Sequence, residues 1–325
     1  MKIKGLVPAA GKGTRGGAAY KATSKPGAPI LDRPSIQWTV EFLADAGISP
    51  EDIGVVVSSD SRQQITDHFC KSGTLLANSI RSKGSDELEK KMYRSMADTV
   101  MRAENSKSMA FIEQETGVGI PYGNGMPILQ AEYFLAGYPF VYTFSDDLFL
   151  SSGKNEIEQL VDAFRSNGGK GSFLSCLLIS DEADKDRFGM IDGDFIEIEA
   201  NGRKLIKIKE IIEKPGVGSS LRFASVSSYL FEPAFLEYLK KAELEFDGNG
   251  EFSIQPTIQR MIEDGYEFYA VPIDGGYFDT GNPVEFTMTQ VAFALSVPEF
   301  SMFRDKLAKL VASDPDLLKR IENIR

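Results

Sequence analysis

Histidine and cysteine are nearly missing from this chain of 325 residues, which has one histidine, His68, and two cysteines, Cys70 and Cys176. A single histidine excludes zinc sites built from several histidines, and it disfavours schemes in which a histidine activates a serine or cysteine nucleophile. His68 lies in a segment with the pattern of a surface helix, so we assign it no catalytic role. Because the two cysteines are far apart in sequence, we expect reduced thiols and not a disulfide framework.

Long hydrophobic runs and blocks of positive charge are missing as well. The longest apolar runs, such as 55–57 and 173–179, are far too short to span a bilayer, and the N-terminus has no leader pattern. We therefore expect a cytoplasmic protein with no membrane partner. The 36 Lys and Arg against 47 Asp and Glu give a formal charge of −11, which repels nucleic acid. An anionic substrate must be held by a few well-placed cations.

The first half of the chain alternates between apolar runs typical of strands and amphipathic segments typical of helices. The pattern predicts strands at 3–7, 53–57, 108–113, 140–144 and 173–179, and helices at 35–46, 60–69, 127–135 and 155–164. Repeated strand–helix units favour an α/β fold of the Rossmann-like type, with a mixed, mostly parallel sheet flanked by helices. Ligands of such sheets bind at the carboxyl ends of the strands.

The second half is less regular. We expect antiparallel strands at 195–199 and 205–212, strands at 224–231 and 268–271, and helices at 233–242 and 254–264. Residues 1–296 are predicted to form one domain that includes a charged, partly helical insertion at 70–107. Residues 297–325 are predicted to be a helical extension.

A loop rich in glycine follows the first predicted strand. It carries Gly11, Lys12, Gly13, Thr14 and Arg15. Glycines let backbone N–H groups approach phosphate oxygens, and the two cations add charged donors. This pattern predicts a phosphate-binding loop, and so a nucleotide ligand.

The same residues also fit the G-x-G-x-x-G fingerprint of dinucleotide-binding proteins, with Asp32 about 20 residues further on. That fingerprint requires a helix to begin in the loop, and Pro26, Pro29 and Pro34 do not allow a full-length helix there. The sequence therefore favours a long, extended loop over NAD binding. A tight glycine turn without a ligand remains an alternative.

Acidic residues in two separate segments have the chemistry of a metal site. Asp146 and Asp147 end an apolar run, and Asp279 lies in a turn that precedes a helix. Mg²⁺ prefers one or two carboxylates together with phosphate oxygens, and it would allow a polyphosphate to lie beside these acids. Because side chains alternate along a strand, we expect at most one of the adjacent pair to face the ligand. Helix caps or solvated loop acids are the alternative interpretation.

The stretch from Val7 to Arg15, followed by Lys25 and by Pro29-Ile30-Leu31-Asp32-Arg33-Pro34, resembles the signature of the sugar-1-phosphate nucleotidylyltransferases. Within that family the resemblance is greatest to the bacterial enzymes that act on UTP and glucose-1-phosphate. It implies that Ala10, Gly11, Gly13 and Thr14 bind the triphosphate, that Arg15 and Lys25 act on it, and that Asp146 and Asp279 hold Mg²⁺.

The resemblance extends to the sugar phosphate and the base. It implies that Glu213 contacts sugar hydroxyls, that Lys214 contacts the sugar phosphate, that Gly189 lies near the sugar, and that Gly123 and Gly125 form the turn that reads the base. The family has a glutamine shortly before this turn, where the chain has Val118; Gln114 is our candidate for its role, and its neighbours Glu113 and Glu115 are the alternatives. Val226-Ser227-Ser228-Tyr229 also lacks the family's glycine. Both departures leave the base and the sugar open.

The resemblance implies an enzyme that converts a nucleoside triphosphate and a sugar-1-phosphate into a nucleotide sugar and pyrophosphate. UTP and glucose-1-phosphate are the expected substrates. The alternatives are another base, such as that of CTP or GTP, a sugar other than glucose, or a nucleotide-sugar-binding protein without catalysis. No protein nucleophile is needed, which agrees with the few histidines and cysteines. Family precedent also implies a homo-oligomer.

Overall fold

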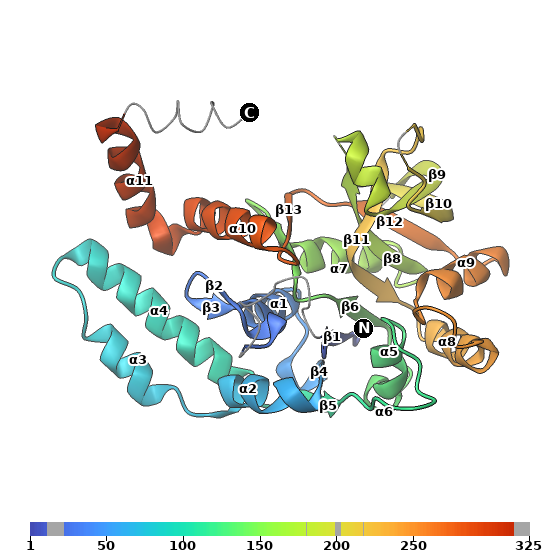
Figure 1. Cartoon of the computed structure of the whole chain (residues 1–325), viewed down its shortest axis with the longest axis horizontal. Helices are drawn as coiled ribbons and strands as arrows, with labels where there is room; N and C mark the ends of the chain where they lie inside the picture. The colour runs from blue at the N-terminus through green and yellow to red at the C-terminus, as the bar shows by residue number, and fades with distance from the viewer. Residues whose placement is uncertain (12–22, 180, 199–202, 217, 315–325) are drawn as a thin grey trace.

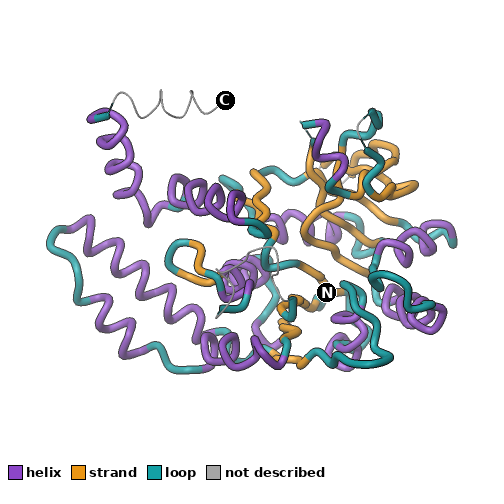
Figure 2. Tube along the Cα trace, in the orientation of Figure 1, coloured by secondary structure: helices purple, strands orange, loops and turns teal. Residues whose placement is uncertain are grey.

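The computed structural model describes residues 1–11, 23–179, 181–198, 203–216 and 218–314. Figure 2 shows strands clustered in the centre and helices around them. The strands are β1 (Lys4–Ala9), β2 (Pro29–Ile30), β3 (Arg33–Pro34), β4 (Ile53–Val57), β5 (Ala110–Glu113), β6 (Phe140–Thr143), β7 (Asp147–Leu150), β8 (Ser172–Leu178), β9 (Gly189–Ile198), β10 (Arg203–Glu213), β11 (Phe223–Phe231), β12 (Phe268–Pro272) and β13 (Gly276–Asp279).

Helices occupy most of the remaining described chain. They are α1 (Ser35–Asp45), α2 (Ser59–Cys70), α3 (Thr74–Arg81), α4 (Glu87–Asn105), α5 (Met126–Gln130), α6 (Glu132–Leu135), α7 (Glu156–Ser166), α8 (Ala234–Glu245), α9 (Gln255–Glu263), α10 (Pro283–Ser296) and α11 (Ser301–Ser313). Short 3₁₀ turns are η2 (Lys25–Gly27), η3 (Pro50–Asp52), η4 (Glu182–Asp186) and η5 (Pro298–Phe300).

One large sheet has the strand order β5-β4-β1-β6-β11-β8-β12-β10-β9. Among its described strands, only β10 and β11 run against the others. The prediction of a mixed, mostly parallel sheet of Rossmann-like type is therefore confirmed. An additional pairing of β9 with β11 closes β11, β8, β12, β10 and β9 into a ring.

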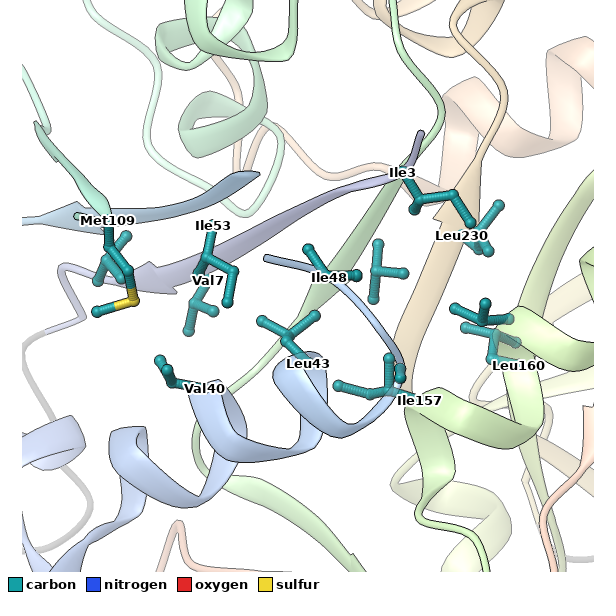
Figure 3. Packing of buried hydrophobic residues seen from close by; sticks show 14 of the residues in the cluster. Ile3, Val7, Val40, Leu43, Ile48, Ile53, Met109, Ile157, Leu160 and Leu230 are labelled. Carbon is teal, nitrogen blue, oxygen red and sulfur yellow. The ribbon is translucent and has the colours of Figure 1, made fainter. Parts of the chain in front are cut away.

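Each face of the sheet is covered by its own group of helices. Val7 of β1 packs on one side with residues of α1, α2 and α7. Figure 3 shows Val40, Leu43 and Ile157 pointing from these helices toward the strands. The preceding residue, Leu6, packs on the opposite side with residues of α5, α6, α8 and α9. Since neighbouring strand residues face opposite ways, an apolar strand such as β1 requires helices on both sides.

A two-stranded ribbon, β7 paired with β13, stands beside the main sheet. Leu148 of this ribbon packs with Ile30, Trp38 and Phe293, so the ribbon is fixed against α1 and α10 by a third apolar cluster. This ribbon matters for function because it joins two segments that lie more than 120 residues apart, with Asp279 opposite Asp147.

Helices α3 and α4 lie side by side at one end of the molecule, and α10 leads into α11 near them (Figure 1). Among the described helices, none is both long and apolar enough to cross a membrane. The two cysteines are not joined in a disulfide; Cys176 is buried and Cys70 is exposed.

The short strands β2, β3, β7 and β13 are not among the predicted strands, and two further elements differ in their bounds. The helix expected at 127–135 is two short helices, α5 and α6, because the backbone at Ala131 leaves helical geometry with ψ near 6°. The strand expected to begin at 195 begins at Gly189, where it pairs with the end of β10. The start of β9 is not visible in local periodicity, because it depends on pairing with the end of β10.

Candidate active site

Three carboxylates meet where the β7–β13 ribbon leaves the sheet. Asp146 lies in the turn after β6, Asp147 begins β7, and Asp279 ends β13. One carboxylate oxygen from each lies within 4.8 Å of those of the other two. Thr280 holds the turn closed, because its backbone N–H and its Oγ1 donate to the carbonyl oxygen of Asp146 at 2.8 and 2.9 Å.

The expectation that only one of the adjacent aspartates faces the ligand is wrong. Asp146 is in a turn, not in a strand, so the alternation of side chains does not apply to it. The structure brings both members of the pair to one cluster with Asp279.

Charged and polar groups surround this acidic cluster. The Lys25 ammonium forms an ion pair with Oδ2 of Asp146, and the Arg187 guanidinium lies 3.6 Å from Oδ2 of Asp279. The Tyr277 hydroxyl donates to Oδ1 of Asp147 at 2.8 Å. Desolvation by burial, followed by the neighbouring charges of Asp146 and Asp279, raises the pKa of Asp147 well above its ordinary value.

The donor set of this cluster fits a divalent cation. Hard cations such as Mg²⁺ and Mn²⁺ prefer oxygen ligands, and three carboxylates converge here within reach of one ion. The pKa of Asp147 is raised first by burial and then by the neighbouring acids, and a bound cation would offset both effects. Asp146 and Asp279, the two predicted ligands, are therefore together, and Asp147 is a third candidate.

The predicted sugar-phosphate residues lie next to this cluster. Gly189 pairs with Glu213 across β9 and β10, and a Cβ at Gly189 would lie 3.1 Å from Oε2 of Glu213. The Lys214 backbone N–H donates to the carbonyl of Phe188 at 3.2 Å. The Phe188 ring meets the ring of Tyr277 edge-on at 5.8 Å. Since Tyr277 is bonded to Asp147, this chain of contacts links the sugar-phosphate motif to the acids.

Lys214 has the geometry of a residue held by its surroundings. Its φ is +45°, in the left-handed region that side chains other than glycine rarely adopt. Its Nζ lies 3.4 Å from Oε1 of Glu213, and both side chains are about half exposed. The pair is therefore accessible to a ligand.

The predicted base-reading turn is built against one backbone segment. The Gly125 N–H donates to the carbonyl of Phe252 at 3.0 Å, and the Phe252 N–H donates to the carbonyl of Tyr122 at 2.7 Å. A Cβ at Gly123 would lie 2.2 Å from the same Phe252 oxygen, and its φ is +149°. Glycine is therefore required at this position by both space and conformation.

Gln114 and Val118 differ in a way that bears on the base. The Gln114 N–H donates to the carbonyl of Val57 at 2.7 Å, which continues the pairing of β5 with β4, and Gln114 is half-buried. Val118 is fully exposed on the loop that follows. Gln114 is thus fixed to the sheet at a strand end, whereas Val118 is not packed.

Only the start of the predicted phosphate loop can be placed. Ala10 and Gly11 directly follow β1, and the carbonyl of Ala9 accepts a hydrogen bond of 3.2 Å from Ser61 Oγ at the start of α2. Gly13, Thr14 and Arg15 lie outside the described residues.

Sequence reasoning missed Arg187 and Tyr277 and did not select Asp147. Asp147 could have been found, because its neighbour had already been selected and a turn at 145–146 would place both acids together. Arg187 and Tyr277 adjoin predicted motifs, Phe188-Gly189 and Asp279, but no local pattern predicts that they contact the acids.

A mixed sheet with an acidic cluster and cations at the strand ends is typical of enzymes that transfer nucleotidyl groups. The Nucleotidyl transferase family matches residues 4–294. The chain belongs to this family.

Among its relatives are the UTP–glucose-1-phosphate uridylyltransferases of Staphylococcus haemolyticus, 31% identical over 95% of this chain and 96% of the relative, and of Bacillus subtilis, 30% identical over 94% of both. Solved structures share the fold. A UTP-bound UGPase from Acinetobacter baumannii has a TM-score of 0.76 at 23% identity, over 95% of this chain and 99% of that one. A UDP-glucose pyrophosphorylase complexed with UDP-glucose has a TM-score of 0.72 at 22% identity, over 90% and 98%.

Proposed function

We propose that this enzyme transfers a uridylyl group from UTP to glucose-1-phosphate. A phosphate oxygen of the sugar phosphate attacks the α-phosphorus of UTP, the bond from that phosphorus to the β-phosphate bridging oxygen breaks, and UDP-glucose and pyrophosphate leave. The observation that carries the proposal is the meeting of Asp146, Asp147 and Asp279 beside Lys25 and the Glu213–Lys214 pair. The full-length similarity to uridylyltransferases supports the choice of substrates.

The chain's own cations would bind and orient the two anionic substrates. Lys25, which the structure places on Asp146, and Arg15 would neutralise charge on the departing pyrophosphate. Lys214 would hold the sugar phosphate in line with the α-phosphorus, and Glu213 would accept hydrogen bonds from sugar hydroxyls. Ala10, Gly11, Gly13 and Thr14 would line the triphosphate, and Gly189 would leave room for the sugar.

We propose Mg²⁺ as the cation held by Asp146 and Asp279. When bound, it supplies positive charge that lets phosphate groups lie beside carboxylates and that stabilises the developing negative charge. Asp147 would complete the cluster, with Tyr277 fixing the orientation of its carboxylate. We also propose that the enzyme works in the cytoplasm.

We propose that Gly123, Gly125 and Gln114 recognise the uracil base. A glycine turn packed on Phe252 offers backbone groups in fixed positions, and Gln114 offers an amide that can both donate and accept.

We propose that copies of this chain associate. One side of α10 exposes four apolar residues at helical spacing, Val284, Met288, Val291 and Leu295. The opposite side of the helix is buried through Phe293 and Ala294. A helix that is apolar on both sides is typical of an element covered by a partner.

The test is a screen of the four common nucleoside triphosphates against several sugar-1-phosphates, with pyrophosphate release measured in the presence of Mg²⁺. We expect UTP with glucose-1-phosphate to give the largest kcat/KM, and EDTA to abolish release. A clear preference for CTP or GTP would contradict the proposed base, and binding of UDP-glucose without turnover of any pair would contradict catalysis.

A further inference from the structure

A buried network of hydroxyl groups lies directly behind the acidic cluster. Ser227 Oγ is 3.2 Å from the carbonyl oxygen of Asp147 and 3.0 Å from Oε2 of Glu156. Glu156, in the first turn of α7, is only 2% exposed, and Ser227 is 3% exposed. The buried carboxyl group of Glu156 is thus connected to the acidic cluster through the hydroxyl of Ser227.

The backbone at Ser227 is bent in order to make this connection. The pairing of β11 with β8 shifts register between Ser225 and Tyr229, and within this irregularity Ser227 has φ of +57°. A serine seldom adopts this left-handed conformation, and it persists only where surrounding contacts compel it. Bulges of this kind commonly redirect a side chain near an active site.

The count of hydrogen atoms determines which form of Glu156 can complete the network. A serine hydroxyl has one hydrogen to donate, and Ser227 Oγ faces two acceptors if Glu156 is ionised. The hydroxyl of Ser228 already donates to Oγ1 of Thr143 at 2.8 Å. If Glu156 is a neutral carboxylic acid, it donates to Ser227 Oγ, which then donates to the Asp147 carbonyl, so both contacts of Ser227 are hydrogen bonds.

The surroundings of Glu156 favour this neutral form. Burial raises the pKa of Glu156 to about 7, even though hydrogen bonds from the hydroxyls that face it from β8 and β11 act to lower it. The charged groups connected with this network are Asp147 beyond Ser227, then Asp146, Asp279 and the Lys25 ammonium in the acidic cluster, and Glu158 in the same helix.

We propose that neutral Glu156 and Ser227 are positioning residues that hold Asp146 and Asp147 in place for cation binding by the acidic cluster. The carboxylic acid of Glu156 donates a hydrogen bond to Ser227 Oγ. Ser227 in turn donates to the carbonyl oxygen of Asp147 and so keeps the carboxylates of Asp146 and Asp147 in the acidic cluster. The part of this inference that concerns turnover rests on the proposed function. The part that concerns cation binding does not.

The test is titration of the full-length protein with Mn²⁺ alone, followed by calorimetry, beside steady-state kinetics with UTP and glucose-1-phosphate. Ser227→Gly removes the hydroxyl and suits the left-handed backbone, so the variant should fold normally. We expect about tenfold weaker Mn²⁺ binding and a similar loss of kcat, with KM for UTP unchanged, which is the usual scale for groups that orient a metal ligand.

Ser172→Ala is the matched control. Ser172 is as buried as Ser227, and its hydroxyl accepts a hydrogen bond from the Glu232 N–H at 3.1 Å, but it does not contact the acids. This variant should bind Mn²⁺ like the unaltered protein even if its melting temperature falls.

Glu156→Gln tests whether Glu156 acts as a neutral hydrogen-bond donor or as an anion. The amide can donate to Ser227 as the carboxylic acid does, so Mn²⁺ affinity should stay within about twofold. Unchanged Mn²⁺ binding in Ser227→Gly would overturn the proposal, as would a loss in Glu156→Gln equal to that in Ser227→Gly. If the unaltered protein shows no uridylyl transfer while the Mn²⁺ titrations still separate the variants, the proposed function fails and the positioning role stands.

Discussion

At the scale of single residues, Asp146 is the position on which the proposed chemistry depends most directly. It contacts Lys25 and lies close to Asp279, so in the proposed mechanism its charge would serve both the cation site and the lysine proposed to bind phosphate. We expect Asp146→Asn and Arg15→Ala each to lower kcat at least about 100-fold, the scale for losing one group that stabilises a transition state. Pyrophosphate release measures this loss. Asp67→Asn, which affects an exposed pair with Lys71, is the control and should be silent; near-normal turnover in Asp146→Asn would refute its role.

Glu156 also gives a pH dependence of stability. Its pKa is raised in the folded protein to about 7 from 4.5, so the folded state binds more protons than the unfolded state between these values. The contribution of this group to stability is fully present below about pH 4.5 and is lost as the pH rises through 7. The loss reaches about 3 kcal/mol at most, from the difference in pKa.

Urea unfolding of the unaltered protein and of Glu156→Gln at pH 5 and pH 8 checks this. The free energy of unfolding of the unaltered protein, relative to Glu156→Gln, should fall between the two pH values by up to about 3 kcal/mol. Glu251→Gln, an exposed change, should give no such difference. A constant offset between the unaltered protein and Glu156→Gln would mean that Glu156 is not protonated in the folded state.

The sequence was a good guide to individual residues where chemistry and position coincide. Asp146 and Asp279 were predicted as partners from separate motifs, and the structure brings them together with Lys25. Arg187 and the Glu156–Ser227 contact could not be predicted in this way. They arise from the β7–β13 ribbon and from a bulge in β11, and neither leaves a periodic signal in the chain.

At the scale of elements, the turn before α5 depends on close approach of two backbones. Gly123→Ala places a Cβ 2.2 Å from the carbonyl oxygen of Phe252 at φ of +149°, so the turn or the 252 segment must move. We expect a loss of at least about 2 kcal/mol of stability and a raised KM for UTP. Thermal unfolding and kinetics measure the two effects. Gly153→Ala meets no atom within 4 Å and should be neutral, and a Gly123→Ala protein with unchanged KM would argue against base recognition by this turn.

The kind and order of the longer elements were predictable, whereas the short strands β2, β3, β7 and β13 and several bounds were not. Buried runs such as β4, Ile53–Val57, and amphipathic helices such as α1 carry strong patterns. The start of β9 at Gly189 depends on pairing with the end of β10, which lies elsewhere in the sequence. Local propensity carries no information about such partners.

At the scale of the whole molecule, the apolar side of α10 should govern association. Replacing Met288 and Val291 by glutamate puts two charges on this surface, and burying them without partners in an interface is unfavourable. Light scattering of the unaltered protein should give a multiple of the chain mass, and the double variant should give the mass of one chain. Leu244→Glu, at an exposed position on α8, should leave the mass unchanged. A double variant that assembles like the unaltered protein would place the interface elsewhere.

The contact between Lys25 and Asp146 has a consequence for the resting enzyme. The ammonium is a counter-ion tethered to the chain, so the three acids are partly neutralised before any solute arrives. A divalent ion that binds the acids would then have to displace the Lys25 ammonium from Asp146. With the proposed cation, the free-ion concentration at which the enzyme becomes half active would accordingly depend on Lys25 as well as on the carboxylates.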